Sequence, residues 1–139
     1  MNSGTYILFP YGAIGQNVLK IPLTNPIPLP AINGSELFMD HLYVEYRQPT
    51  GLDAALGSLP EGTPTLAPID INGLMIRGKI AGGITTYLLD MTPNSISLTP
   101  ASDFLDSFLL SGQEFYVDNI TIRAGDIADG SAVVEVDVY

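Results

Sequence analysis

Apolar and polar residues alternate with a period of two in most of the periodic stretches of this sequence. Residues 131–139 give the clearest case, because Ala132, Val134, Val136 and Val138 alternate with a second set of side chains that includes two carboxylates. A strand with one buried face has this pattern, since successive side chains point to opposite faces of a sheet. The same alternation predicts strands at 6–9, 18–23, 37–46, 74–80, 84–91 and 114–124.

A turn and a bulge are predicted where the alternation breaks. Gly82 and Gly83 separate two alternating runs, and paired glycines supply the positive φ values of a tight turn. Residues 74–91 are therefore predicted to form a β-hairpin. Within 114–124 the apolar positions change parity at 118–119, which predicts a β-bulge inside one continuous strand.

The strand predicted at 37–46 has one mainly apolar face and one more polar face. The alternation places on the first face Phe38, Leu42, Val44 and Tyr46, and on the second Met39, His41, Tyr43 and Glu45. The chain's one histidine, His41, thus falls on the more polar face of a strand. A lone histidine in such an alternation is far more often structural than catalytic, since a serine triad needs a nucleophile and an orienting acid beside it.

One short helix is predicted near the end of the third quarter of the chain. Thr99 and Pro100 offer a cap and a first-turn proline before the apolar run 103–110, and Gly112 follows that run. With no other helical periodicity, the sequence predicts an all-β fold. We expect an antiparallel β-sandwich, jelly-roll-like, with about eight strands and one short helix. The 139 residues are expected to form a single domain, 1–139, with one hydrophobic core.

Two segments rich in proline and glycine stand apart from the strands. Residues 21–32 contain four prolines, which predicts an extended arm that cannot lie in the middle of a sheet. This arm either drapes over a neighbouring subunit or packs as an edge segment on its own core. Residues 47–68 form a long predicted loop, of a length that is often functional. The candidate interface residues of the two segments are Ile21, Leu23, Ile27, Leu29, Ile32, Leu52, Leu56 and Leu59.

Charge is the most informative feature of the composition. Charged residues make up 14% of the chain, compared with about 25% in an ordinary soluble domain, so much of the surface is expected to be apolar or neutral and available for an interface. The net charge is −10, and the five basic residues are scattered along the sequence, which predicts no patch for phosphates and no direct nucleic-acid binding.

The sequence contains no convincing catalytic or metal-binding motif. It has no cysteine and no phosphate or dinucleotide loop, so we expect neither an enzyme nor a bound cofactor. Asp126 and Asp129 bracket a turn and could bind calcium, although any hairpin turn favours the same residues. Glu135 and Asp137 share a strand face and could act as paired acids, although a solvated strand face is the simpler explanation. No basic leader or membrane-spanning apolar run is present.

The layout resembles that of single jelly-roll capsid, penton and capsid-decoration proteins of viruses and phages. The shared features are short bulged strands, long loops rich in proline and glycine, the apolar arm at 21–32, and a strand at 131–139 that reaches the end of the sequence. The resemblance concerns the general arrangement of strands and loops over most of the chain, and it assigns a role to no individual residue. It implies a non-enzymatic subunit that packs by symmetry with copies of itself and with other capsid subunits.

The expected function is therefore that of a structural virion protein, assembled in the host cytoplasm through apolar subunit interfaces. The alternative is a monomeric β-sandwich module that binds a carbohydrate or a peptide with loops at one end. A small hydrolase that uses Glu135 or Asp137 is a third, weaker alternative.

Overall fold

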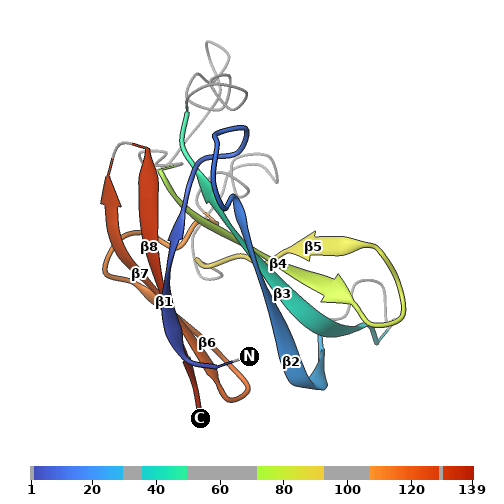
Figure 1. The fold of residues 1–139 in the computed structure, drawn as a ribbon. Helices are drawn as coiled ribbons and strands as arrows, with labels where there is room; N and C mark the ends of the chain where they lie inside the picture. The colour runs from blue at the N-terminus through green and yellow to red at the C-terminus, as the bar shows by residue number, and fades with distance from the viewer. Residues whose placement is uncertain (1, 30–35, 50–71, 93–106, 129) are drawn as a thin grey trace.

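The computed structural model describes residues 2–29, 36–49, 72–92, 107–128 and 130–139, and these residues form two packed antiparallel sheets of four strands each (Figure 1). The all-β sandwich predicted from the alternation is confirmed. The eight strands are β1 Gly4–Leu8, β2 Val18–Pro28, β3 Phe38–Arg47, β4 Gly73–Ile80, β5 Thr86–Leu88, β6 Glu114–Val117, β7 Ile120–Ala128 and β8 Ser131–Val138.

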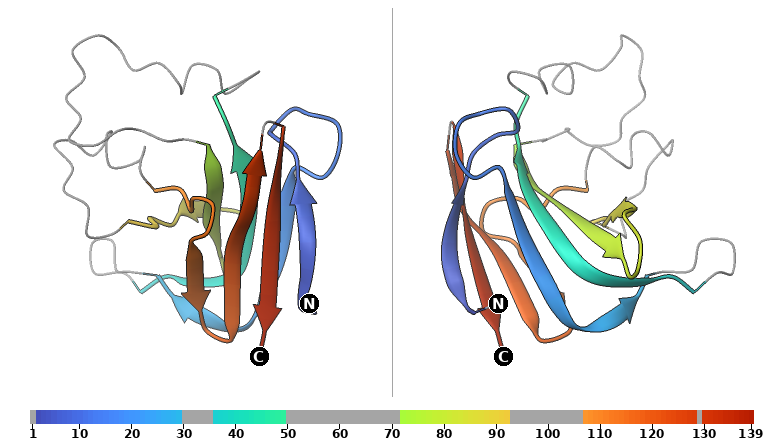
Figure 2. Two further views of the ribbon diagram at one scale, coloured as in Figure 1. Left: turned by 90° about the vertical axis from the view of Figure 1, so that its left-hand side faces the viewer. Right: turned by 45° about the vertical axis from the view of Figure 1, so that its right-hand side comes forward.

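The strand order follows the chain closely. One sheet has the order β1-β8-β7-β6 and the other β2-β3-β4-β5, so each sheet is built around a run of consecutive antiparallel strands (Figure 2). The first and last strands pair, with Gly4 opposite Val136 and Leu8 opposite Ala132. A jelly roll contains two Greek keys, whereas here β2 to β5 form one meander and β6 to β8 another, with β1 added beside β8. The sandwich is thus as predicted, but its connectivity differs from that of a jelly roll.

The core lies between the two sheets and is continuous. Its fully buried side chains come from both sheets and include Leu8, Ile21, Leu42, Val44, Leu74, Ile76, Ile122 and Val134. Because inward and outward positions alternate along each strand, this one core also determines which residues lie on the two outer faces.

Tyr46 connects the two sheets by hydrogen bonds as well as by packing. Its ring is fully buried in the core on β3, and its hydroxyl lies 2.7 Å from Oδ1 of Asn72 and 2.8 Å from Oε1 of Gln48. The same hydroxyl lies 3.2 Å from the carbonyl oxygen of Ala128, on β7 of the opposite sheet. A buried phenol needs such partners, because an unsatisfied hydroxyl in the core is costly.

Two strand predictions need correction. The parity change at 118–119 is a turn between β6 and β7 and not a bulge: Val117 pairs with Ile120, and Asp118 has a φ of 51°. Asp tolerates this left-handed conformation better than most residues, so a two-residue reversal is possible there without glycine. In β3 the register shifts between Met39 and His41, which turns Met39 into the core and leaves Phe38 41% exposed.

The predicted helix is not found in the described part of the chain. Residues 107–110 are described, and there Leu109 forms an antiparallel bridge with Leu74, with N–O distances of 2.9 Å in both directions. Phe108 and Leu109 are buried, so burial beside β4 outweighs the local helical preference of this short run. The earlier residues of the predicted helix lie outside the described residues.

The proline-rich segment packs on its own domain as far as it is described. β2 is the edge strand of its sheet, and Pro22, Pro26 and Pro28 fit this position because an edge strand has free N–H positions that proline can occupy. Ile21 and Leu29 are buried in the core. Residues 30–35 lie outside the described residues, as does most of the predicted loop 47–68.

The described residues contain no helix that is long and apolar enough to cross a membrane.

Candidate functional site

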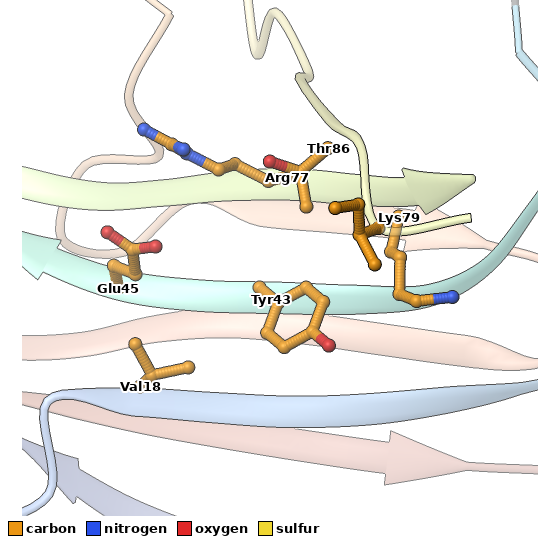
Figure 3. A pocket seen from close by; sticks show the side chains of 7 residues that line it. Val18, Tyr43, Glu45, Arg77, Lys79 and Thr86 are labelled. Atoms are coloured by element: carbon orange, nitrogen blue, oxygen red, sulfur yellow. The ribbon is translucent and has the colours of Figure 1, made fainter.

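The outer face of the β2-β3-β4-β5 sheet contains a shallow groove of about 400 Å³ (Figure 3). The groove crosses all four strands and the β4–β5 turn, and its lining residues are Val18, Tyr43, Glu45, Arg77, Lys79, Ile84 and Thr86. The strand register explains why these residues meet: Val18 lies opposite Glu45, Tyr43 opposite Arg77, and Lys79 opposite Thr86.

The same face gathers four of the five basic residues of the chain. Lys20, Arg47, Arg77 and Lys79 all occupy outward positions of β2, β3 or β4. Two carboxylates, Asp40 and Glu45, accompany them, so this outer face has an excess of positive charge in a protein whose net charge is −10. The cations are scattered along the sequence as predicted, but the sheet brings four of them together in space.

Two of these cations have carboxylate partners. Lys79 Nζ lies 3.2 Å from Oδ1 of Asp40, and His41 Nδ1 lies 2.6 Å from the same oxygen. The hydrogen bond from His41, followed by the hydrogen bond and charge of Lys79, lowers the pKa of the Asp40 carboxyl group. Arg47 Nη2 lies 2.5 Å from Glu45 Oε2, and its guanidinium stacks 4.7 Å from the centre of the Tyr11 ring.

Arg77 and Lys20 have no carboxylate partner among the described residues. Lys20 is exposed, whereas Arg77 is half-buried. The only side-chain hydrogen bond of Arg77 to a described residue runs from Nη2 to the Met75 sulfur at 4.0 Å. Arg77 Nε is buried, and no described residue forms a hydrogen bond with it. A buried guanidinium nitrogen has lost its hydrogen bonds to water, and no described residue replaces them. Such a group favours an anion in the groove.

The side chains that line the groove are suited to binding a ligand. The Tyr43 ring and the Ile84 side chain offer apolar surface, Thr86 offers a hydroxyl, and Arg77 offers a planar set of donors that suits a carboxylate. The described residues hold no cluster of three or more potential metal ligands.

The outer face of the other sheet has the opposite charge balance. Arg123 of β7 lies between two carboxylates, with Nε 2.5 Å from Glu114 Oε1 and Nη1 2.8 Å from Glu135 Oε2. The hydrogen bond with Glu135, and next that with Glu114, raises the pKa of the Arg123 guanidinium. Asp137 lies two residues beyond Glu135 on the same face, so three carboxylates accompany one cation there.

Three of the acidic residues singled out in the sequence are described, and they lie on β7 and β8. Glu135 and Asp137 share an outer face as predicted, and Glu135 pairs with Arg123, so their role as paired acids stays a prediction. Asp126 is exposed near the end of β7, and Asp129 lies outside the described residues, so the calcium hypothesis stays a prediction. His41 lies beside the groove with its Nδ1 bound to Asp40.

The candidate interface residues of the arm lie mostly inside the domain. Ile21 and Leu29 are in the core and offer no surface to a partner, which corrects their assignment; Leu23 and Ile27 are partly buried against the same core. Ile32, Leu52, Leu56 and Leu59 lie outside the described residues. Sequence reasoning missed Arg77, Lys20 and Tyr43, because only the register of β2, β3 and β4 brings them into one row.

Comparisons with models of protein families, with curated proteins and with solved structures find no match for this chain.

Proposed function

We propose that this protein is a structural virion protein, a capsid, penton or capsid-decoration subunit that assembles through apolar subunit interfaces. The low proportion of charged residues supports this proposal, because a monomer normally covers its surface with more charge. The β-sandwich supports it as a scaffold in which both outer sheet faces can contact neighbours.

The observation that carries the proposal is the exposure of large apolar side chains on turns that are held by hydrogen bonds. Ile14 in the β1–β2 connection is 99% exposed, and Ile84 in the β4–β5 turn is 97% exposed. Single exposed apolar residues are ordinary on a surface, but Ile84 also borders the groove, and Tyr11, which is 50% exposed, shares the connection with Ile14. Such side chains gain stability when a partner covers them.

Both turns are held in place by hydrogen bonds. Asn17 Nδ2 lies 2.9 Å from the carbonyl oxygen of Pro10 and 3.0 Å from that of Ala13, which ties the β1–β2 connection together. In the β4–β5 turn, Ile80 N donates to the Thr85 carbonyl at 2.9 Å. A turn fixed in this way presents its isoleucine to a partner with little further loss of conformational entropy on binding.

The test is the solution mass of the purified protein, measured by light scattering over a range of concentrations. We expect a trimer, a pentamer or a larger species, and closed or extended assemblies in electron micrographs of the concentrated protein. The double variant Ile14→Ser, Ile84→Ser should shift the mass toward the monomer while its circular dichroism spectrum stays unchanged. A wild-type monomer at every concentration would contradict the proposal.

The groove supports a second candidate function, a monomeric module that binds a carbohydrate or a peptide. Tyr43 offers an aromatic face, while Arg77 and Thr86 offer polar contacts. This candidate predicts a monomer whose melting temperature rises with ligand and whose response is lost in Tyr43→Ala. A self-associating wild-type protein that no sugar or peptide stabilises would argue against it.

A further inference from the structure

We propose that the groove on the β2-β3-β4-β5 sheet of one copy binds the acidic outer face of the β1-β8-β7-β6 sheet of a second copy. This inference rests on the proposed function, since it names the partner and the contact through which the subunits assemble. The contact is heterologous: each subunit offers two different surfaces, and repeated contacts form a ring when the rotation closes, or an open chain when it does not.

The first argument is a cross-strand row with two cations, Arg77 in the groove and Lys20 beside it, that have no carboxylate partner among the described residues. Lys20, Tyr43 and Arg77 lie opposite one another on β2, β3 and β4, so the two cations flank the tyrosine in one cross-strand row. Neighbouring strands are about 4.8 Å apart, which places the backbones of Lys20 and Arg77 about 10 Å apart. Two cations at this separation suit two carboxylates on one sheet face, whereas nucleic acid requires a longer series of cations.

The second argument is the state of Arg77. Its Nε is buried, and within the described part of the chain it has no hydrogen-bond partner and its guanidinium no carboxylate at ion-pair distance. The carboxylates on its own face are already engaged, Glu45 by Arg47 and Asp40 by Lys79 and His41. No other carboxylate of the described residues pairs with Arg77, which leaves its guanidinium open to an anion from a second copy.

The third argument is the surface that the other sheet offers. Asp137 forms no ion pair among the described residues, while Glu135 and Glu114 keep exposed area around Arg123, with side chains 42% and 29% exposed. Tyr116 on β6 of the same face is 66% exposed and can contribute apolar contact beside the carboxylates. This face joins unpaired negative charge to an exposed aromatic ring, and the groove joins unpaired positive charge to the exposed Ile84. The two surfaces are complementary in charge, which favours their pairing over contact between two like faces.

The test uses two charge-reversal variants of the full chain. Arg77→Glu reverses the charge of the groove and keeps the acidic face, whereas Asp137→Lys reverses an acidic-face charge and keeps the groove. Each variant alone should associate at least about tenfold more weakly than the wild type in sedimentation velocity at 0.1 M salt, and the wild-type association should weaken at higher salt. The conservative variant Arg77→Lys should retain most of the association. Glu36→Lys, which makes the same two-unit change at an exposed site before β3, should associate as the wild type does.

The decisive measurement is an equimolar mixture of the two variants. The intact acidic face of Arg77→Glu can bind the intact groove of Asp137→Lys, so the mixture should recover the association that each variant has lost on its own. A contact between identical faces gives no such complementation. Circular dichroism and melting temperatures of the variants identify any loss that comes from misfolding, and Arg77→Gln then provides a milder change at the same position.

The possible failures of the two proposals are distinguishable. If the wild type assembles and both reversal variants assemble equally well, the groove contact is wrong and the proposed function stands. If the variants fail alone and the mixture also fails, a heterologous contact between these faces is wrong. If the wild type is a monomer at every concentration, both proposals fail, and binding of a short polyglutamate peptide that Arg77→Glu abolishes would identify an acidic peptide as the occupant instead.

Discussion

Arg77 and Arg123 occupy equivalent positions in the two sheets but have opposite surroundings. Each lies on the outer face of the strand next to a short edge strand, Arg77 on β4 beside β5 and Arg123 on β7 beside β6. The cross-strand neighbours of Arg123 are Glu114 and Glu135, and both bind it. The cross-strand neighbours of Arg77 are Leu88 and Tyr43, which cannot neutralise a cation.

The difference shows that the same residue at the same place in a sheet has a role set by its cross-strand neighbours. Opposite charges on directly paired residues of neighbouring strands stabilise a sheet, so Arg123 stabilises the sheet to which it belongs. Arg77 forms no such pair with any described residue, and under the proposed contact its charge pairs with a second copy. The following experiments are ordered from the largest expected effect to the smallest.

Truncation of a buried side chain should lower the free energy of unfolding by a similar amount in either sheet, whereas changes on the two outer faces should differ. Ile76 of β4 and Ile122 of β7 are both fully buried in the shared core. Ile76→Ala and Ile122→Ala should each lower the free energy of unfolding by about 2–5 kcal/mol, because each leaves a cavity. Urea denaturation measures this loss, and a much smaller loss for one of the two would mean that the sheets do not share one cooperative core.

The link between the sheets should depend on the Tyr46 hydroxyl. Tyr46→Phe keeps the ring but removes the contacts to Asn72, Gln48 and Ala128, so we expect a loss of about 1–3 kcal/mol in the free energy of unfolding. Denaturation of Tyr46→Phe and of the exposed control Tyr116→Phe measures the difference. An unchanged stability would show that the polar groups around Tyr46 find other partners.

Replacing each of the two arginines by methionine should affect the melting temperature differently on the two outer faces. Arg123→Met leaves Glu114 and Glu135 as like charges around an apolar side chain, so the melting temperature should fall modestly at low salt and less at high salt. Arg77→Met removes an unsatisfied cation, so the melting temperature should stay level or rise. A fall for Arg77→Met as large as that for Arg123→Met would remove the contrast between the two positions.

The Asp40 cluster should give a small dependence of stability on acid. His41 and Lys79 lower the pKa of Asp40 below its ordinary value of 3.8, so the stabilisation is complete above that value and is lost as the pH falls through the lower folded pKa. Melting temperatures measured from pH 6 to pH 2 should therefore decrease somewhat less for Asp40→Asn than for the wild type. Parallel curves would show that Asp40 contributes nothing in the folded state.

Local patterns in the sequence account for most of the strands and few of the contacts. The hairpin of β4 and β5 and the strand β8 were predicted by alternation and by Gly82, because these signals depend on neighbouring residues. Phe38 and Met39 lie on the opposite faces to those predicted, because the register shift in β3 leaves no signal in the sequence. The turn at Asp118 was mistaken for a bulge, because a change of parity is the same whether the chain bends or reverses.

The sequence by itself determined that the chain is an all-β protein with a low-charge surface, since the alternation and the composition are properties of the residues in order. Only the tertiary structure decided that Ile21 and Leu29 are core residues and that Lys20, Tyr43 and Arg77 form one row. The physical reason is that cross-strand register joins residues more than twenty positions apart. That register is set by the packing of the whole core, and no short stretch of sequence specifies it.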